Sequence, residues 1–282
     1  SARELLSGDR VSVVQVLPFL RAGGGAQMAL DDGLLDEAEA VVARRYTWAP
    51  PALSLGKFQK LDIVPGLPFE VVRRPTGGRA VLHGEGFEWS FAVVFPEGSL
   101  GEGAEAGRDL ALPYSLVSRS LAAAFAELGV TLDARREAPY QRSALCFASA
   151  LRDDLFARGE KIVAIAQARR GGRVLVHGSV LERRPPDELT AVAETLLGEP
   201  WSGEGLAGAG CVIDADMLWR RALARLDAGL RLAQRGGRLK ETALRVAEPD
   251  EEAEPDEEGK PDDTAASPET GHVERHDERG GA

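Results

Sequence analysis

The chain has 282 residues, of which 44% are hydrophobic, enough to form a substantial core in one large domain or two small ones. Its formal charge of −11 lies entirely at the end of the chain, where fourteen acidic residues stand against three basic ones from Glu248 onward. The preceding residues carry equal numbers of acidic and basic side chains, which gives no electrostatic reason to bind nucleic acid.

The acidic segment, residues 247–282, contains the run EPDEEAEPDEEGKPDD and almost no large apolar side chain. Such a composition buries too little surface to offset the entropy lost on ordering, so we predict a disordered acidic tail. The folded domain is then expected to span residues 1–246. A solubilising extension is the simpler interpretation of the tail, and a docking arm for a basic partner is the alternative.

The sequence indicates a cytoplasmic protein. No basic segment followed by an apolar run stands at its start, and no apolar stretch approaches the roughly 20 residues that cross a bilayer. The two cysteines, Cys146 and Cys211, stand in different settings and do not predict a disulfide. We therefore expect no membrane segment and no disulfide framework.

The predicted elements begin with a strand at residues 11–17, which leads through a glycine loop at 23–25 into a helix. This helix is expected over about 26–43, because apolar side chains recur there at approximately helical spacing. Short strands are predicted at 52–55 and 70–72, and the second runs directly into another glycine-rich loop.

The middle of the chain predicts one strand and one helix. The strand covers residues 89–95, where aromatic and β-branched side chains dominate. The helix that follows is amphipathic, with one apolar face from Val117 to Leu128, and Gly129 is its expected end.

The last part of the folded region predicts an antiparallel hairpin, with strands at 161–167 and 173–181 joined by a turn at Gly171 and Gly172. Two helices and a glycine-rich surface loop complete the prediction, at residues 187–197, 216–234 and 198–210. Because strands follow one another in hairpin-like order with helices between them, we predict an α+β fold with a mixed or antiparallel β-sheet core and packed helices.

The segment VVRRPTGGRAVLH, residues 71–83, joins two predicted strands through paired glycines. Glycines let backbone N–H groups approach a ligand closely and the arginines add positive charge, so the loop suits an anionic or carbonyl-bearing ligand. An ordinary structural turn is the alternative interpretation. The pattern GxxxxGK[ST] is absent, which argues against a phosphate-binding P-loop.

Two residues fifteen positions apart offer nucleophilic chemistry. Lys161 opens an apolar strand in a chain with few lysines and many arginines, and only lysine provides a compact, tunable ammonium. Cys146 lies among small and apolar residues, where an inert buried cysteine is the default. A nearby ammonium lowers the pKa of a cysteine and makes it a nucleophile for thioester exchange. From spacing alone, a lysine that faces water and an inert core cysteine remain the alternatives.

His177, Gly178 and Ser179 lie near the end of the predicted hairpin, where the histidine either orients a substrate or packs in the core. The histidines and cysteines show no zinc-ligand spacing, so we predict no metal site. The absence of a GxSxG elbow argues against a serine hydrolase of that type.

In this order the motifs resemble those of the biotin/lipoate protein ligase superfamily, and most of all its protein octanoyltransferases. The similar segments are YTWAPPALSLGKFQ (46–59), VVRRPTGGRAVLH (71–83), CF (146–147), KIVAIAQ (161–167) and VHGSVL (176–181). The resemblance extends from about Met28 to about Leu232, and RRPTGGRAVLH is its most specific part. It implies the fold of a lipoate/biotin ligase catalytic domain.

The resemblance implies that Cys146 is the acyl-thioester nucleophile, and that Lys161 lowers its pKa and donates a hydrogen bond to the acyl oxygen. It implies octanoyl-acyl carrier protein as the donor, and a lipoyl domain of a 2-oxoacid dehydrogenase subunit or the glycine-cleavage H protein as the acceptor. We expect a monomer without a cofactor. The residues expected to bind substrate are Arg74, Thr76, Gly77, Gly78, Arg79, Ala80, His83, Ile165, His177, Gly178 and Ser179.

Two alternatives are kept. One is a lipoate–protein ligase that uses ATP and Mg, in which the lysine contacts the activated acyl group and no thiol is needed. The other is a catalytically weak relative that binds lipoyl domains or acyl groups.

The sequence departs from the family pattern at Ala164 and Ile165, where a small Gly-Ser pair is usual, and at Gly84, where an aspartate is common. Strict strand alternation puts Ile165 on the face of Lys161. We therefore predict apolar bulk close to the acyl group, which either shortens the acyl pocket or disturbs the placement of the acyl group.

Overall fold

The computed structural model describes residues 12–100, 111–133, 143–148 and 154–234. The predicted acidic tail and the domain boundary at residue 246 lie outside these residues. The helices are α1 (Gly24–Glu37), α2 (Leu112–Glu127), α3 (Asp187–Leu197), α4 (Gly205–Gly208) and α5 (Ala215–Gln234). The strands are β1 (Val14–Val16), β2 (Leu20–Ala22), β3 (Val41–Trp48), β4 (Ala52–Leu55), β5 (Glu70–Arg73), β6 (Val81–His83), β7 (Glu88–Pro96), β8 (Leu155–Ala157), β9 (Glu160–Arg170) and β10 (Arg173–Leu181).

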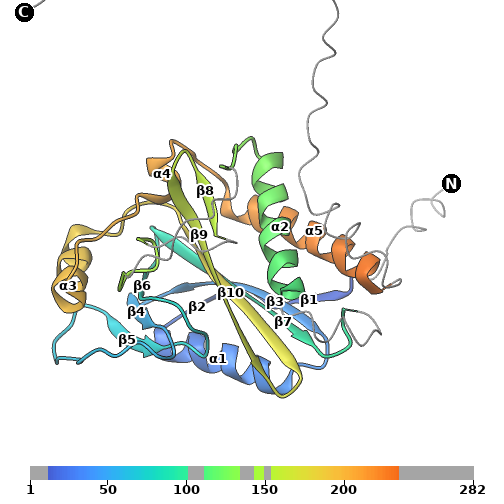
Figure 1. Cartoon of the computed structure of the whole chain (residues 1–282), viewed down its shortest axis with the longest axis horizontal. Coiled ribbons are helices and arrows are strands. Elements are labelled where there is room, and N and C mark those ends of the chain that lie inside the picture. The colour runs from blue at the N-terminus through green and yellow to red at the C-terminus, as the bar shows by residue number, and fades with distance from the viewer. Residues whose placement is uncertain (1–11, 101–110, 134–142, 149–153, 235–282) are drawn as a thin grey trace, which may run out of the picture. The chain divides into compact units, whose positions relative to one another are not determined.

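The described strands form two sheets (Figure 1). The larger sheet has the order β1–β3–β7–β10–β9–β8, and β2 pairs with the end of β3. The pairings of β1 and β2 with β3 are parallel, whereas those from β3 to β8 are antiparallel. The smaller sheet, β5–β4–β6, is also mixed. The predicted α+β class with a mixed sheet is confirmed, but its division into two sheets was not predicted.

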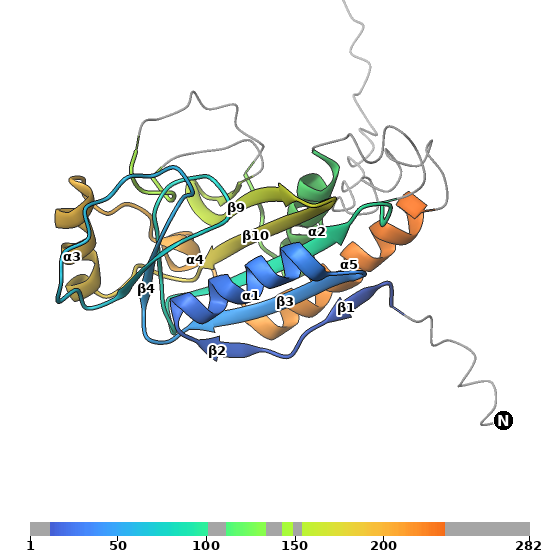
Figure 2. The same ribbon diagram turned by 90° about the horizontal axis from the view of Figure 1, so that it is seen from below.

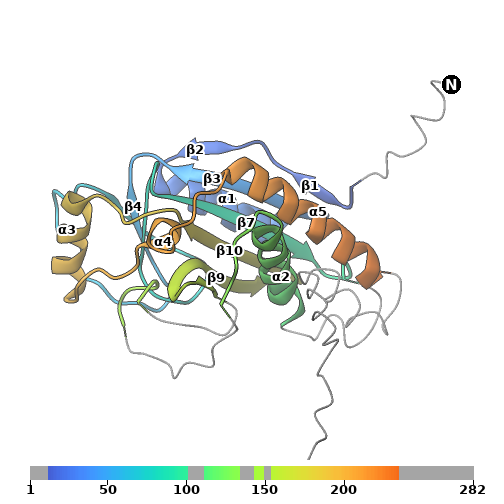
Figure 3. The ribbon, with the colours of Figure 1, turned by 90° about the horizontal axis from the view of Figure 1, so that it is seen from above.

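Helices cover both faces of the larger sheet. Figure 2 shows α1 in front of this sheet and α5 behind it, and Figure 3 shows α2 and α5 together on the opposite side from α1. Helices α2 and α5 contribute Leu121 and Leu226 to one apolar cluster, and α1 contributes Met28 and Leu35 to another. A third cluster joins the smaller sheet to α3 through residues such as Leu53 and Leu189.

The first helix is shorter than predicted, because it ends at Glu37 and residues 41–43 already belong to β3. The strand β3 was not predicted. Almost all of its residues are buried, so the alternation of polar and apolar residues that marks a half-exposed strand is missing. Its Arg44 is fully buried and is neutralised by Asp31 of α1, at 2.6 Å.

The predicted hairpin is confirmed as β9 and β10, which pair in antiparallel register from Arg173↔Arg170 onward. Gly171 and Gly172 both have positive φ, at 55° and 74°, which a two-residue hairpin turn with φ > 0 at both positions requires. The glycine-rich segment after α3 is more than the predicted surface loop. It contains α4, and Trp201 and Leu206 within it are buried.

No helix in the described part of the chain combines the length and the apolar character that crossing a membrane requires.

Candidate active site

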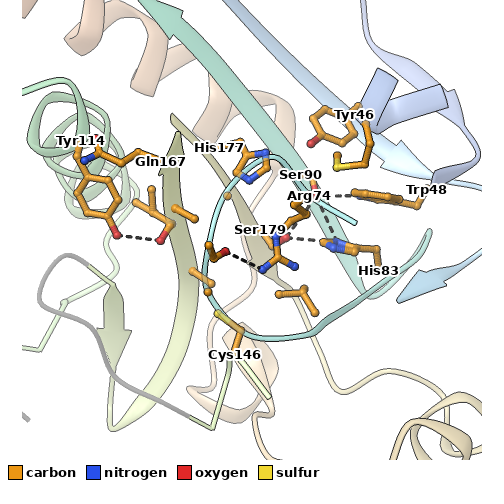
Figure 4. A pocket seen from close by; sticks show the side chains of 18 residues that line it. Tyr46, Trp48, Arg74, His83, Ser90, Tyr114, Cys146, Gln167, His177 and Ser179 are labelled. Carbon is orange, nitrogen blue, oxygen red and sulfur yellow. Dashed lines mark hydrogen bonds between the residues drawn. The ribbon is translucent and has the colours of Figure 1, made fainter. Parts of the chain in front are cut away.

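A cavity of about 240 Å³ lies where the two sheets meet. Its walls come from α1, α2, β3, β6, β7, β9 and β10, from the loop after β5, and from the segment that holds Cys146. Figure 4 shows how the labelled side chains surround it, with Cys146 on one wall. Segments far apart in sequence therefore build one site.

Lys161 and Cys146 are in contact. Nζ of Lys161 lies 3.7 Å from Sγ of Cys146 and donates a 2.9 Å hydrogen bond to its backbone carbonyl. The lysine side chain is only 1% exposed and also pairs with Asp154, at 2.6 Å between Nζ and Oδ2. The alternative of a lysine that faces water is therefore wrong. Cys146 is half-buried and lines the cavity, while Lys161 stands behind it.

The backbone of Cys146 is joined to the predicted glycine loop. The amide of Ala80 donates to the carbonyl of Ala144 at 2.9 Å, and the amide of Cys146 donates to the carbonyl of Ala80 at 2.9 Å. Ala80 and Arg79 do not line the cavity, whereas most of the other predicted binding residues do. Ala80 contributes through its main chain, because these two hydrogen bonds fix the Cys146 segment against the loop.

The buried side chain of Arg74 forms hydrogen bonds with the main chain of the glycine loop. Its side chain is buried and donates to the carbonyl oxygens of Ser54, Gly77 and Arg79, at 2.7, 3.2 and 2.8 Å. Burial lowers the pKa of the guanidinium. Gly78 needs to be glycine, since its φ is +93°.

Thr76 and His177 connect the loop to the larger sheet through a buried chain of hydrogen bonds. Oγ1 of Thr76 lies 2.7 Å from Nε2 of His177, whose Nδ1 lies 3.0 Å from Oδ2 of Asp31. Burial alone would raise the pKa of Asp31, but Arg44 and His177 outweigh it, so that the pKa is lowered. His177 lines the cavity, whereas Thr76 lies behind it.

His83 belongs to a second buried polar network. Its Nε2 lies 2.6 Å from Oγ of Ser54 and its Nδ1 lies 3.0 Å from Oε1 of Glu88, while Trp48 stacks on the ring at 4.0 Å. Oγ of Ser179 also lies 3.4 Å from Nδ1 of His83. Burial lowers the pKa of His83, and the carboxylate of Glu88 opposes this. His83 and Ser179 thus form a rigid polar wall of the cavity.

Gly178 and Gly84 are glycines for steric reasons. A Cβ at Gly178 would lie 2.4 Å from the carbonyl oxygen of Ala164 and 2.6 Å from the ring of Phe91. A Cβ at Gly84 would lie 2.4 Å from the ring of Phe87, so the aspartate common at this position in the family does not fit this packing.

The predicted position of Ile165 on the face of Lys161 is wrong. Phe156 pairs with Lys161 and Leu155 with Val163, so one extra residue of β9 forms a bulge that breaks the alternation. Ile165 packs into the cluster beneath α2, whereas Ala164 packs into the cluster that contains Cys146. Ile165 still lines the cavity.

Several residues of the site were not predicted. Tyr114 donates a 2.8 Å hydrogen bond to the carbonyl of Ile165, and Gln167 lines the cavity beside it. Asp154 could not be singled out from the sequence, because it is one of two adjacent aspartates before a short strand and nothing local distinguishes them. Gln167 ends the motif KIVAIAQ and could have been found from that segment. Among the described residues, no group of three or more His, Cys, Asp or Glu side chains is arranged to hold a metal ion.

The mixed sheet, the covering helices and the lysine behind a cavity define a lipoate ligase type of catalytic domain. A lipoate-protein ligase A bound with ATP shares the fold, with a TM-score of 0.55 at 20% identity over 82% of this chain and 92% of that one. The family model for the lipoyl protein ligase A/B catalytic domain matches residues 24–195. The chain belongs to this family.

Two relatives have names that describe an activity. The chain is 38% identical over 180 residues to octanoyltransferase LipM of Carboxydothermus hydrogenoformans, which covers 60% of this chain and 65% of the relative. It is 35% identical over 181 residues to octanoyltransferase LipM of Staphylococcus aureus, which covers 57% and 63%. The chain thus matches less than two thirds of the length of either relative.

Proposed function

We propose that the protein is a protein octanoyltransferase, which moves an octanoyl group through a thioester on Cys146 to a lysine of a lipoyl domain. The observation that carries this proposal is the 3.7 Å approach of Lys161 Nζ to Cys146 Sγ beside the cavity. The similarity to octanoyltransferases LipM supports the nature of the acyl group.

In the first step, the Cys146 thiolate attacks the carbonyl carbon of octanoyl-acyl carrier protein. The new carbon–sulfur bond forms as the bond to the carrier breaks, and the carrier thiolate leaves and takes a proton from solvent. In this proposal Lys161 is the donor that stabilises the oxyanion, and the 3.7 Å approach of its Nζ to Sγ supports this role. A preorganised donor of this kind is worth about 2.7–4 kcal/mol.

In the second step, the neutral amine of the acceptor lysine attacks the Cys146 thioester. The amide bond forms, the carbon–sulfur bond breaks, the amine releases one proton to solvent, and the thiolate is regenerated. The acceptors that we propose are lipoyl domains of 2-oxoacid dehydrogenase subunits or the glycine-cleavage H protein. No cofactor takes part in either step.

The cavity suits an alkyl chain. Met28, Val81, Ala164 and Ile165 offer apolar surface to it. Burial of each methylene group there stabilises the bound acyl chain by about 0.8 kcal/mol. Polar side chains, among them His83 and Ser179, also line the cavity (Figure 4).

An ATP-dependent lipoate ligase is the second candidate, because the fold is shared with such a ligase. That reaction needs no thiol, so the contact between Cys146 and Lys161 favours the transferase. A catalytically weak relative that only binds acyl groups or lipoyl domains is the third.

One experiment separates the three. The protein and its Cys146→Ala variant are incubated with octanoyl-acyl carrier protein, and their intact masses are measured before and after addition of a lipoyl domain. We expect an octanoyl adduct on the unaltered protein alone, which disappears as the lipoyl domain gains the group. A parallel incubation contains lipoate and ATP. Formation of lipoyl-AMP there, without any octanoyl adduct, would identify a ligase. Absence of both products would identify a protein that only binds acyl groups or lipoyl domains.

A further inference from the structure

A buried guanidinium and a buried carboxylate are joined by a continuous series of side-chain hydrogen bonds. Nη1 of Arg74 donates to Oγ of Ser54 at 2.7 Å, and this hydroxyl lies 2.6 Å from Nε2 of His83. Nδ1 of His83 in turn lies 3.0 Å from Oε1 of Glu88. Each of these residues is 6% exposed or less. We call the series the relay, and its members are Arg74, Ser54, His83 and Glu88.

The chemistry of the two ends gives the relay a direction. A guanidinium can only donate, and a carboxylate can only accept. Because Oγ of Ser54 accepts from Arg74, its own proton is available to a second partner. Nε2 of His83 lies 2.6 Å from this oxygen, whereas the carbonyl oxygen of Val81 lies at 3.5 Å, the limit of a hydrogen bond. Nε2 is then the acceptor, and the ring proton lies on Nδ1, where Glu88 accepts it.

The surroundings of His83 favour this neutral form of the ring. Burial lowers the pKa of His83, and the guanidinium of Arg74 and the ring of His177 act in the same direction. The carboxylate of Glu88 opposes them, but the pKa remains lowered. One neutral tautomer therefore satisfies every hydrogen bond of the relay.

The other arm of the guanidinium holds the glycine loop. While Nη1 of Arg74 is bonded to Ser54, Nη2 donates to two carbonyl oxygens of the loop, at 3.2 and 2.8 Å. The guanidinium is a planar fork, so an orientation imposed on Nη1 also sets that of Nη2. The residue after the second carbonyl is Ala80, whose own carbonyl accepts from the amide of Cys146 at 2.9 Å. The relay thus ends one residue away from the hydrogen bond that holds the Cys146 segment.

Three members of the relay also have the arrangement of a serine-hydrolase triad, in which the hydroxyl is the nucleophile. Two observations argue against that role here. Ser54 is 0% exposed and does not line the cavity, although His83 does. The oxygen of Ser54 is also already bonded to Arg74. A hydroxyl held in this way links two side chains and does not reach a substrate.

We propose that the relay positions the glycine loop and, through it, Cys146, with His83 as the neutral tautomer that carries its proton on Nδ1. Ser54, His83 and Glu88 are then positioning residues, because they act on the Cys146 segment through Arg74 and the loop. The role of Cys146 in acyl transfer rests on the proposed function, whereas the relay concerns the protein without substrate.

Amide hydrogen exchange, read by mass spectrometry, tests this positioning directly. Ser54→Ala removes the hydroxyl that joins Arg74 to His83, but it keeps the main-chain carbonyl of residue 54 to which Nη1 also donates. We expect the amides of Ala80 and Cys146 to exchange about tenfold faster, because the loop opens more easily. The amides of the hairpin β9–β10 should keep their rates. Unchanged exchange in the loop, or equal acceleration in the hairpin, would overturn the proposal.

Ser120→Ala is the matched control. Ser120 is also a buried serine, but it lies on α2, and its hydroxyl has no hydrogen-bond partner within the described part of the chain. We expect the amides of Ala80 and Cys146 to exchange in this variant as they do in the unaltered protein. An acceleration there as large as that in Ser54→Ala would count against the relay.

Two replacements of His83 test the direction of the relay. The side-chain amide of glutamine reaches the place of Nε2, and that of asparagine reaches the place of Nδ1. His83→Gln therefore still offers an acceptor to Ser54, whereas His83→Asn keeps only a bond to Glu88. We expect the loop amides to exchange about fivefold faster in His83→Asn than in His83→Gln. Equal rates or the reverse order would overturn the proposal, also if Ser54→Ala does not fold.

The functional readout compares two reactions of Cys146. Alkylation by iodoacetamide requires only access of a small reagent, whereas formation of the octanoyl adduct also requires a correctly placed thiol. We expect Ser54→Ala to slow adduct formation about tenfold or more and to slow alkylation much less. Equal slowing of both reactions would contradict a positioning role. If the unaltered protein forms no adduct, the transferase function is rejected, and the exchange rates still decide on the relay.

Discussion

Thr76 and His177 are 101 residues apart in sequence, yet Oγ1 of the first lies 2.7 Å from Nε2 of the second. This buried hydrogen bond connects the glycine loop that holds Cys146 to the central strand β10. Because His177 continues the chain of hydrogen bonds to Asp31 on α1, the loop is fixed to two layers of the fold at once.

Replacement of Thr76 by valine tests that connection. Valine keeps the shape but leaves the buried Nε2 of His177 without its partner, which costs about 1–3 kcal/mol of unfolding free energy. We expect this loss in urea denaturation, together with slower alkylation or acylation of Cys146. Thr195→Val is the matched control, since Thr195 is an exposed helical residue that bonds only within α3. Equal losses in the two variants would contradict the prediction.

Gly178 and Gly77 predict opposite responses to the same substitution. Gly178→Ala places a Cβ against Ala164 and Phe91, and overpacking of this kind costs about 1–3 kcal/mol or more. Gly77 has no heavy atom within 4 Å of the added Cβ, so Gly77→Ala should leave the unfolding free energy nearly unchanged. Chemical denaturation of both variants checks this, and a stable Gly178→Ala protein would show that β9 and β10 pack less tightly than described.

The pH dependence of the unfolding free energy should contain a contribution from His83. Its folded pKa is lowered by burial, so below the ordinary histidine pKa of about 6.5 the unfolded chain binds the proton more readily than the folded one. His83 therefore makes its full contribution to the unfolding free energy above about pH 6.5. This contribution declines as the pH falls, by at most about 1.4 kcal/mol per pH unit. Urea denaturation at pH 7.5 and 5.5 measures the decline, and His83→Gln should reduce it. A decline of equal size in the variant would assign it to other groups.

Ile165 should limit the length of the acyl chain, because it closes the cavity on the side of α2. We expect Ile165→Ala to accept longer acyl groups from carrier protein, with a loss of about 2–5 kcal/mol in stability. Competition between acyl donors of different length, read by intact mass, gives the preference. Ile162→Val is a control on the same strand that packs in the core without lining the cavity. A shift of preference in this control would show that loosened packing, rather than cavity length, sets the selectivity.

The sequence predicts most readily those elements that local chemistry determines. The turn of the long hairpin follows from Gly171 and Gly172, since few other residues accept positive φ at both positions. The end of α2 follows from Gly129 for the same reason, with φ of 78°. The pairing of Cys146 with Lys161 needed the order of several motifs, because no local pattern relates a loop cysteine to a strand lysine.

Features that depend on tertiary structure could not be predicted. The strand β3 is buried on both faces, and it contains an arginine whose charge is neutralised by Asp31 of the preceding helix α1. The bulge in β9 shifts Ile165 to another face, and nothing in the motif KIVAIAQ indicates the extra residue. Asp154 acquires its role only where β8 and β9 meet, so its importance lies in the fold and not in its neighbours in sequence.

The cavity draws its walls from residues as far apart as Met28 and Ser179, so no shorter piece of the chain contains all of them. A group that fills the cavity therefore contacts most layers of the domain and resists their separation. Ligand at one hundred times its dissociation constant adds about 2.7 kcal/mol to the unfolding free energy, and a tethered acyl chain acts in the same sense. Under the proposed function, the acylated and free forms of the protein should then melt at different temperatures, and each reaction cycle would pass through a more and a less heat-resistant form of the same domain.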